Sequence, residues 1–171
     1  FSRAIDLILA CQGVVVVTFV LLRIGTQYGL ENVDQSFTQM EPRIERGAHL
    51  FIKKYARTPD DLMYEDIIMY KRQPWKRVSY AYEFARIVGK PGDLVEITAS
   101  KLWRAERRDG KLGAKQPVTE PYLDPRDRPP DFSAFIVPRN YVLVLHDRRD
   151  HREPLRNLLV PARAIEGRVI R

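Results

Sequence analysis

Imidazole and carboxylate groups that could bind a divalent cation stand close together in one stretch near the C-terminus. His146 and Asp147 are adjacent, and Asp150 and His151 follow shortly after. Both kinds of side chain ligate divalent metals. Positive charges interspersed among them would repel a cation, at Arg148, Arg149 and Arg152. We therefore expect no metal or other cofactor here, and interpret the stretch as a turn that faces solvent or a partner.

The arginines of the C-terminal third are the second candidate for function. Each could meet a phosphate group of an anionic lipid, worth about 1 kcal/mol per residue near a membrane surface, or could simply be solvated. Trp75, beside Lys76 and Arg77, is either an interfacial anchor or a half-buried aromatic. We expect no nucleic-acid binding, because a basic stripe with interleaved aromatics is missing. Arg148, Arg149, Arg152 and Trp75 are the candidate lipid or partner contacts.

The alternating pattern of Tyr80–Val88 predicts a β-strand. We expect this strand to position the residues of a functional site. Side-chain alternation places Phe84 and Arg86 on one face and Ala85 on the other. A tight turn follows, and a second strand restarts after it. The turn residues are Gly89, Lys90, Pro91, Gly92 and Asp93.

Composition predicts one folded unit with a single core. The chain has 171 residues, 44% of them hydrophobic, and a formal net charge of +7. The positive charge favours anionic neighbours without choosing among lipid, acidic protein or nucleic acid. A lone cysteine, Cys11, excludes an internal disulfide.

The uncharged run Leu7–Leu22 predicts a transmembrane helix. Its sixteen residues cover about 24 Å of a hydrocarbon layer roughly 30 Å thick. A buried soluble helix and a cleavable signal peptide are the alternatives. We expect residues 1–27 to be a membrane anchor and residues 28–171 to form one domain.

The remainder of the chain predicts an all-β domain of twisted antiparallel sheets. Short runs rich in β-branched and aromatic residues are separated by glycine, proline or charged turns. Tyr28–Phe37 is a polar exit from the expected membrane helix and shows no strong periodicity. Ala105–Lys115 is charged and Pro117–Pro130 carries five prolines, so we expect surface loops in these two stretches. The expected strands are His49–Lys54, Asp66–Tyr70, Tyr80–Val88, Leu94–Thr98, Leu102–Arg104, Tyr141–Leu145 and Ile165–Ile170.

Several motifs in order resemble the type I signal peptidases and the related mitochondrial inner-membrane peptidases. Ala85–Asp93 is similar to their "Lys-Arg-Val-Ile-Gly-Leu-Pro-Gly-Asp" segment, and Val33–Lys54 is similar to their "Gly-x-Ser-Met-x-Pro" box. Glu120–Leu123, Val137–Leu145 and Val160–Arg168 resemble later family segments. The family positions retained in this chain are Met40, Pro42, Gly47, Arg86, Gly89, Pro91, Gly92, Asp93, Asp147, Arg156 and Gly167.

The departures from the family fall where its chemistry would be. The resemblance implies that Gln39 stands in place of the serine nucleophile and Ala85 in place of the lysine base. A Ser/Lys mechanism needs a hydroxyl next to a neutral amine, and neither an amide nor a methyl group can take those roles. We therefore expect a pseudo-peptidase, not an enzyme.

The function we expect is that of an accessory structural subunit in a larger membrane complex, in contact with lipids and other subunits. One alternative is an active peptidase with an unconventional dyad that uses Ser36 or Thr38. Another is a non-cleaving module that binds an extended peptide at a sheet edge. The resemblance places the β domain in the mitochondrial intermembrane space or the bacterial periplasm.

Overall fold

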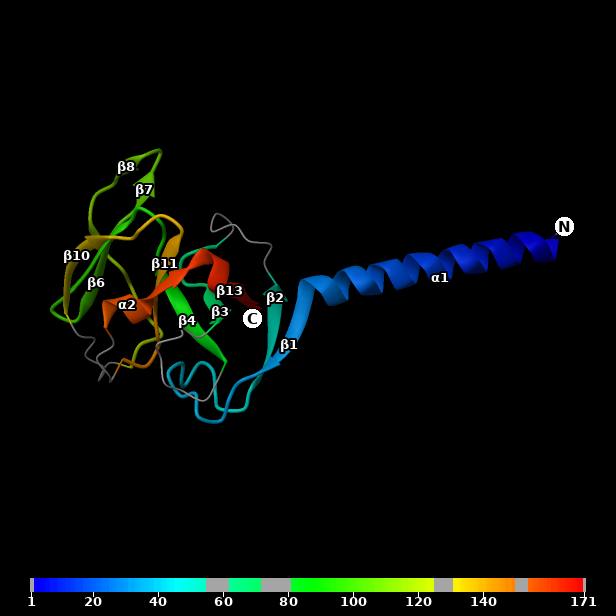
Figure 1. Cartoon of the computed structure of the whole chain (residues 1–171), viewed down its shortest axis with the longest axis horizontal. Coiled ribbons are helices and arrows are strands. Elements are labelled where there is room, and N and C mark those ends of the chain that lie inside the picture. Colours follow the sequence, from blue (N-terminus) through cyan, green and yellow to red (C-terminus); the bar gives the residue numbers. More distant parts are fainter. Residues whose placement is uncertain (1, 55–61, 72–80, 125–130, 150–153, 171) are drawn as a thin grey trace.

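The structure is a computed structural model that describes residues 2–54, 62–71, 81–124, 131–149 and 154–170. It has a long N-terminal helix, α1 (Ser2–Gln27), which projects away from a β domain (Figure 1). A helix over the N-terminal segment was expected and is found. Among the described residues, however, no helix combines the length and apolarity needed to cross a membrane. The predicted transmembrane span over residues 1–27 is therefore not confirmed.

The β domain is built around a seven-stranded antiparallel sheet whose strand order is β1-β2-β13-β3-β4-β11-β12. β4 lies between β3 and β11, so both of its edges are paired, and every residue of the strand except Tyr82 is buried. The strands are β1 (Tyr28–Asn32), β2 (His49–Lys54), β3 (Ile67–Lys71), β4 (Tyr82–Gly89), β11 (Tyr141–Leu145), β12 (Leu159–Pro161) and β13 (Ile165–Val169).

A second sheet of four strands packs beside the first, in the order β10-β5-β6-β9. A short hairpin protrudes from this end of the domain (Figure 1). A short helix, α2 (Leu155–Leu158), and a 3-10 turn, Ala162–Ala164, flank β12. The strands are β5 (Leu94–Thr98), β6 (Lys101–Ala105), β9 (Gln116–Pro117) and β10 (Phe132–Ile136), with β7 (Arg107–Arg108) and β8 (Lys111–Leu112) in the hairpin.

The seven strands expected from the sequence are all present, so the mostly β, antiparallel architecture is confirmed. No strand was expected in Tyr28–Phe37, yet Tyr28–Asn32 is strand β1. Its sequence has no β-branched residue, and it becomes a strand by pairing with His49–Lys53 of β2. The surface loop expected over Ala105–Lys115 was wrong in part, because it contains the hairpin strands β7 and β8. β9, β10 and β12 were also missed, and each is an edge strand of its sheet.

The alternation predicted for β4 divides the core into separate clusters. Phe84 packs with Phe37 and Met69 on one face, and the two aromatic rings meet edge to face at 5.8 Å. Ala85 and Ile87 pack on the opposite face. Val88 belongs to a third cluster under the second sheet. A single strand therefore supplies side chains to every part of the core.

The turn that follows β4 is held by one buried carboxylate. Asp93, 1% exposed, accepts hydrogen bonds from the backbone N–H groups of Lys90 (2.8 Å) and Arg107 (2.9 Å) and from the Tyr64 hydroxyl (2.8 Å). Gly92 has a positive φ of 88°, which favours glycine. The Gly-Lys-Pro-Gly-Asp segment therefore joins the two sheets rigidly.

Candidate functional site

A buried ion pair stands at the centre of the predicted site. Strand pairing sets Leu145 of β11 opposite Arg86 of β4, which brings the arginine beside Asp147. The Arg86 guanidinium donates to both Asp147 carboxylate oxygens, at 2.8 and 2.5 Å, and both side chains are 0% exposed. Arg86 also donates to the carbonyl oxygen of Glu65 at 2.9 Å. Such a bidentate arginine–carboxylate ion pair is stronger than a pair joined by a single hydrogen bond.

The network continues from Arg86 through an aromatic ring to a second ion pair. The Arg86 guanidinium lies 3.9 Å from the centre of the Tyr122 ring, whose hydroxyl donates to Glu120 at 2.8 Å. Glu120 in turn accepts two hydrogen bonds from Arg149, at 3.0 and 2.5 Å. Arg149 also donates to the carbonyl oxygen of His146. Two carboxylates and two guanidinium groups are thus paired inside the protein.

Electrostatics keep this network in one protonation state. Burial lowers the pKa of Arg86, but the hydrogen bonds and charge of Asp147 more than offset this, so the pKa of the guanidinium is raised. Burial and the charge of Glu120 raise the pKa of the Tyr122 hydroxyl. A permanently charged arginine and a neutral phenol are poor proton carriers at neutral pH. The network is therefore suited to holding the fold, not to acid–base catalysis.

The segment that contains Gln39 and Met40 is tied directly to the ion pair. The carbonyl oxygen of Gln39 accepts a hydrogen bond from the N–H of Arg148 at 2.9 Å. The sulfur of fully buried Met40 accepts one from the N–H of Asp147 at 3.4 Å. The cis peptide bond before Pro42 follows in the same segment. Met40, Arg86 and Asp147 thus lie together in the structure.

Ala85 lies on the opposite face of β4 from Arg86. It is 0% exposed and packs in an apolar cluster with Ile68, Ile87 and Val142. A methyl group in such surroundings offers neither a nucleophile nor a base. Glu83 shares this face and accepts a hydrogen bond from the Tyr70 hydroxyl at 2.9 Å.

The alternative nucleophile Ser36 and the turn residue Lys90 belong to different segments of the chain. The Ser36 hydroxyl donates to Asp34 at 2.5 Å, in the loop after β1. Lys90 lies in the turn after β4, with its ammonium 5.0 Å from the centre of the Tyr64 ring. Thr38 lies between the Ser36 loop and the Gln39 segment and is half-buried.

Gly167, Gly47 and Arg156 are retained family positions away from the network around Arg86. Gly167 is buried, and a Cβ there would approach the Lys53 carbonyl oxygen to 2.6 Å, so it lets β13 pair closely with β2. Gly47 takes a positive φ of 68°. Arg156 is exposed on α2.

The candidate surface contacts are only partly at the surface. Arg148 is exposed, with a Glu41 carboxylate oxygen at 3.7 Å. Arg149 is buried in its pair with Glu120 and does not face lipid or solvent. Trp75 and Arg152 lie outside the described residues. No group of three or more potential metal ligands occurs in the described part of the chain.

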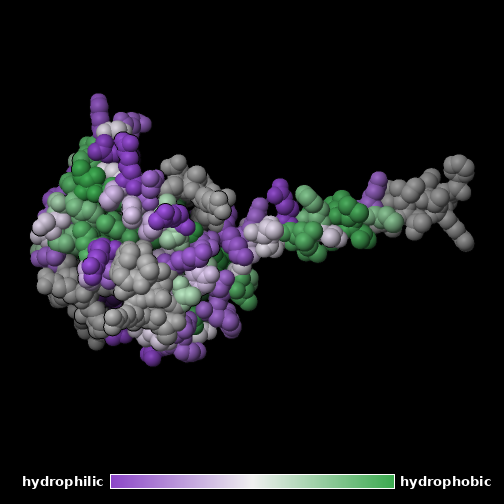
Figure 2. Space-filling view, in the orientation of Figure 1, coloured by the Kyte–Doolittle hydropathy of each residue, from purple (hydrophilic) through white to green (hydrophobic). Residues whose placement is uncertain are grey.

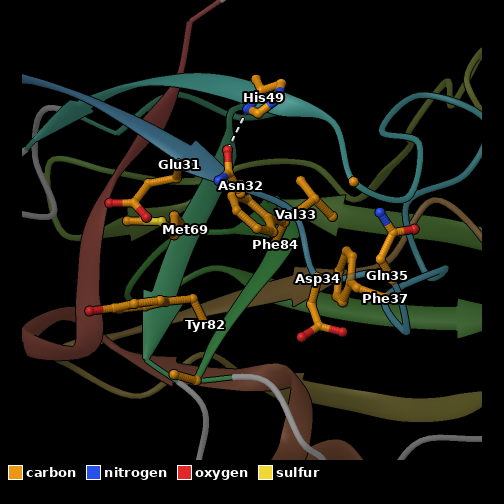
Figure 3. A pocket seen from close by; sticks show the side chains of 12 residues that line it. Glu31, Asn32, Val33, Asp34, Gln35, Phe37, His49, Met69, Tyr82 and Phe84 are labelled. Atoms are coloured by element: carbon orange, nitrogen blue, oxygen red, sulfur yellow. Dashed lines mark hydrogen bonds between the residues drawn. The ribbon is translucent and has the colours of Figure 1, made fainter.

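A cavity of about 620 Å³ opens beside β1, and sequence reasoning missed it (Figure 3). Glu31 and Asp34 supply carboxylates to its wall, while Phe37, Met69 and Phe84 form an apolar floor. Alternation along β1 could have found Glu31, which is partly buried while Leu30 and Asn32 are exposed, but only once Tyr28–Asn32 is known to be a strand. The cavity lies on the Phe84 face of β4, opposite Ala85.

Comparison with known proteins gives one family. The family model described as signal peptidase, peptidase S26, matches residues 7–170. Among 18 matching chains of solved structure is a signal peptidase I from Enterococcus faecalis, with 20% sequence identity and a TM-score of 0.48. That match covers 64% of this chain and 97% of the other. The comparison with curated proteins found no match.

Proposed function

The chain belongs to the signal peptidase family, peptidase S26, and from this membership we propose that it is a non-catalytic member acting as an accessory subunit of a larger membrane complex. The β domain keeps the family's architecture, while the two positions aligned with the catalytic pair carry Gln39 and Ala85. We place the complex in the mitochondrial inner membrane or the bacterial plasma membrane, with the β domain in the intermembrane space or periplasm.

The observation that carries this proposal is the environment of Ala85. Its methyl group is 0% exposed and is enclosed by aliphatic side chains such as Ile68 and Ile87. In another serine protease the loss of one key catalytic side chain costs about six orders of magnitude in turnover. With both positions replaced, cleavage at a useful rate is not expected.

The exposed surface of helix α1 supports the proposed contact with a membrane or with partner subunits. Apolar side chains of α1 are exposed all along the described stretch from Val14 to Leu22, at 47% or more of their surface (Figure 2). Exposed apolar surface of this extent marks an interaction site. The proposal assigns α1 to contact with lipid or with the helices of partner subunits.

A cleavage assay tests the non-catalytic part of the proposal. The purified full chain is incubated in mild detergent with a signal-peptide substrate, beside an active signal peptidase as a positive control. We expect product only in the control. Cleavage by this chain that is abolished by Ser36→Ala or Thr38→Ala would overturn the proposal in favour of a peptidase with an unconventional dyad.

Native electrophoresis of solubilised membranes tests the subunit part. The chain should co-migrate with stoichiometric partners, which mass spectrometry would identify, and should float with membrane vesicles in a density gradient. A monodisperse monomer in mild detergent that does not float would contradict this role.

The cavity beside β1 favours one second candidate, a non-cleaving peptide-binding module. β1 is the terminal strand of its sheet and, within the described residues, pairs only with β2. An edge strand can accept an extended peptide through backbone hydrogen bonds, which require no catalytic side chain. Peptide affinity should survive Gln39→Ala and fall when Ala81→Trp fills the cavity wall. Equal affinity in both variants would count against this function.

A further inference from the structure

We propose that the cavity beside β1 selects an extended peptide that carries a basic side chain, an inference that rests on the second candidate function above. The proposed peptide lies along the open edge of β1. Its lysine or arginine side chain enters the cavity and reaches Glu31 and Asp34.

The position of Glu31 is the first argument. Antiparallel pairing with β2 sets Glu31 opposite Leu50, so both side chains lie on the same face of the sheet, and Glu31 lines the cavity. The Glu31 carboxylate has no ion pair or hydrogen bond with any described residue. Figure 3 shows it at the cavity together with Asp34 and Tyr82.

The second argument is that the cavity is acidic although the whole chain is basic. The protein carries 29 lysines and arginines and a formal net charge of +7. Of the described residues that line this cavity, none is lysine or arginine, while two are acidic. Hydrogen bonds from the side chain and backbone of Ser36 lower the pKa of Asp34, so its carboxylate is charged at neutral pH. A cationic side chain is therefore complementary to this site and an anionic one is repelled.

The apolar floor is the third argument. Phe37, Met69 and Phe84 are each 3% exposed or less and lie below the two carboxylates. Lysine and arginine carry a hydrocarbon stem that packs on such a surface while the charged end stays near water and carboxylates. Aromatic rings add a favourable interaction with the cation. A site with both an apolar floor and an acidic wall fits this side-chain class better than a purely aliphatic one.

The four remaining polar residues at the cavity, Asn32, Gln35, His49 and Tyr82, do not offset its acidity. The His49 ring is engaged by the side-chain oxygen of Asn32 across β1 and β2. The side chains of Asn32, Gln35 and Tyr82 are polar and carry no formal charge. The wall thus keeps a net negative charge when His49 is neutral.

Fluorescence anisotropy with short labelled peptides tests the inference on the full chain. The peptides share an alternating Ala-Val host sequence and differ only at the central position, which is arginine, norleucine or glutamate. Each is titrated with the unmodified protein, with Glu31→Gln, and with Glu31→Gln/Asp34→Asn. Glu45→Gln is the matched control, because Glu45 is exposed on the same chain segment but does not line the cavity. Circular dichroism confirms that each variant is folded.

We expect the arginine peptide to bind about tenfold more tightly than the norleucine peptide, and the glutamate peptide most weakly. The preference for arginine should fall to about twofold in the double variant and remain in Glu45→Gln. Equal binding of arginine and norleucine peptides would overturn the inference while leaving peptide binding intact. If no peptide binds the unmodified protein, the peptide-binding function itself is wrong and the inference falls with it.

Discussion

The buried network around Arg86 and the cavity beside β1 each hold two carboxylates. The two carboxylates of the network form ion pairs with arginines, whereas no described lysine or arginine lines the cavity. Asp147 and Glu120 are buried, and a guanidinium group binds both oxygens of each. Glu31 and Asp34 lie at an open cavity that no described lysine or arginine lines. A buried charge needs an ion-pair partner because it has lost its contact with water. A charge at the mouth of a cavity stays hydrated and can bind a ligand of opposite charge. The first pair therefore holds the fold and the second is available for recognition.

Removal of a buried partner should have the largest effect on stability. Asp147→Ala leaves the Arg86 guanidinium unpaired in the interior, and we expect the free energy of unfolding to fall by about 3–5 kcal/mol. Urea denaturation measures this. Glu166→Ala, which breaks an exposed pair with Lys71, should cost less than about 1 kcal/mol. If Asp147→Ala and Glu166→Ala lower the free energy of unfolding by similar amounts, the buried ion pair does not stabilise the fold more than the exposed one.

Introduction of an unpaired charge on the face of β4 opposite the network should have the second largest effect. Ala85→Lys places an amine in an apolar cluster, and we expect it to cost about 2–4 kcal/mol at pH 7. Ala85→Met, the uncharged control of similar length, should cost about 1–3 kcal/mol.

The pH dependence of these two variants separates charge from size. Burial lowers the pKa of the introduced amine, so the unfolded chain binds more protons and the stability of Ala85→Lys should rise with pH toward about 10. The difference from Ala85→Met should narrow over that range in urea melts. A constant difference would mean that the amine has found water or a carboxylate such as Glu83.

Tyr122 should have a smaller effect with a distinctive pH dependence. Tyr122→Phe removes the hydrogen bond to Glu120 and should cost about 1 kcal/mol at neutral pH. The raised pKa of Tyr122 in the folded state means that its contribution is complete below the unfolded pKa of about 10 and is lost as pH rises further. The stability of the unmodified chain should therefore fall more steeply above pH 10 than that of the variant. Parallel curves would contradict this.

The cavity carboxylates should have the smallest effect on folding. Glu31→Gln should change the free energy of unfolding by no more than about 0.5 kcal/mol, because its carboxylate has no partner among the described residues. Glu120→Gln, the same chemical change inside the network, should cost about 1.5–3 kcal/mol. If thermal melting gives equal shifts for the two variants, the proposed division between fold and recognition is wrong.

Local patterns predicted most of the fold. Period-two alternation placed Arg86 and Ala85 on opposite faces of one strand, and the Gly89–Asp93 turn joins β4 to β5 as expected. Strand β1 was missed because YGLEN has little intrinsic strand preference. Its conformation depends on pairing with β2, which is a tertiary contact.

The sequence alone could not predict which charged residues pair across the fold. Arg149 was grouped with surface arginines, yet it is 5% exposed because Glu120, from another loop, reaches it. The cavity was missed for the same reason, since Glu31 and Phe84 come from distant strands of one curled sheet.

The sequence by itself determined the family, the antiparallel β class and the identities of Gln39 and Ala85, because motifs, alternation and turn residues are local properties of the chain. Only the tertiary structure decided which charges meet. Arg86 and Asp147 are 61 residues apart and become partners because β4 lies beside β11. Pairing between distant strands, and the burial that makes each charge need a partner, are properties of the folded sheet alone.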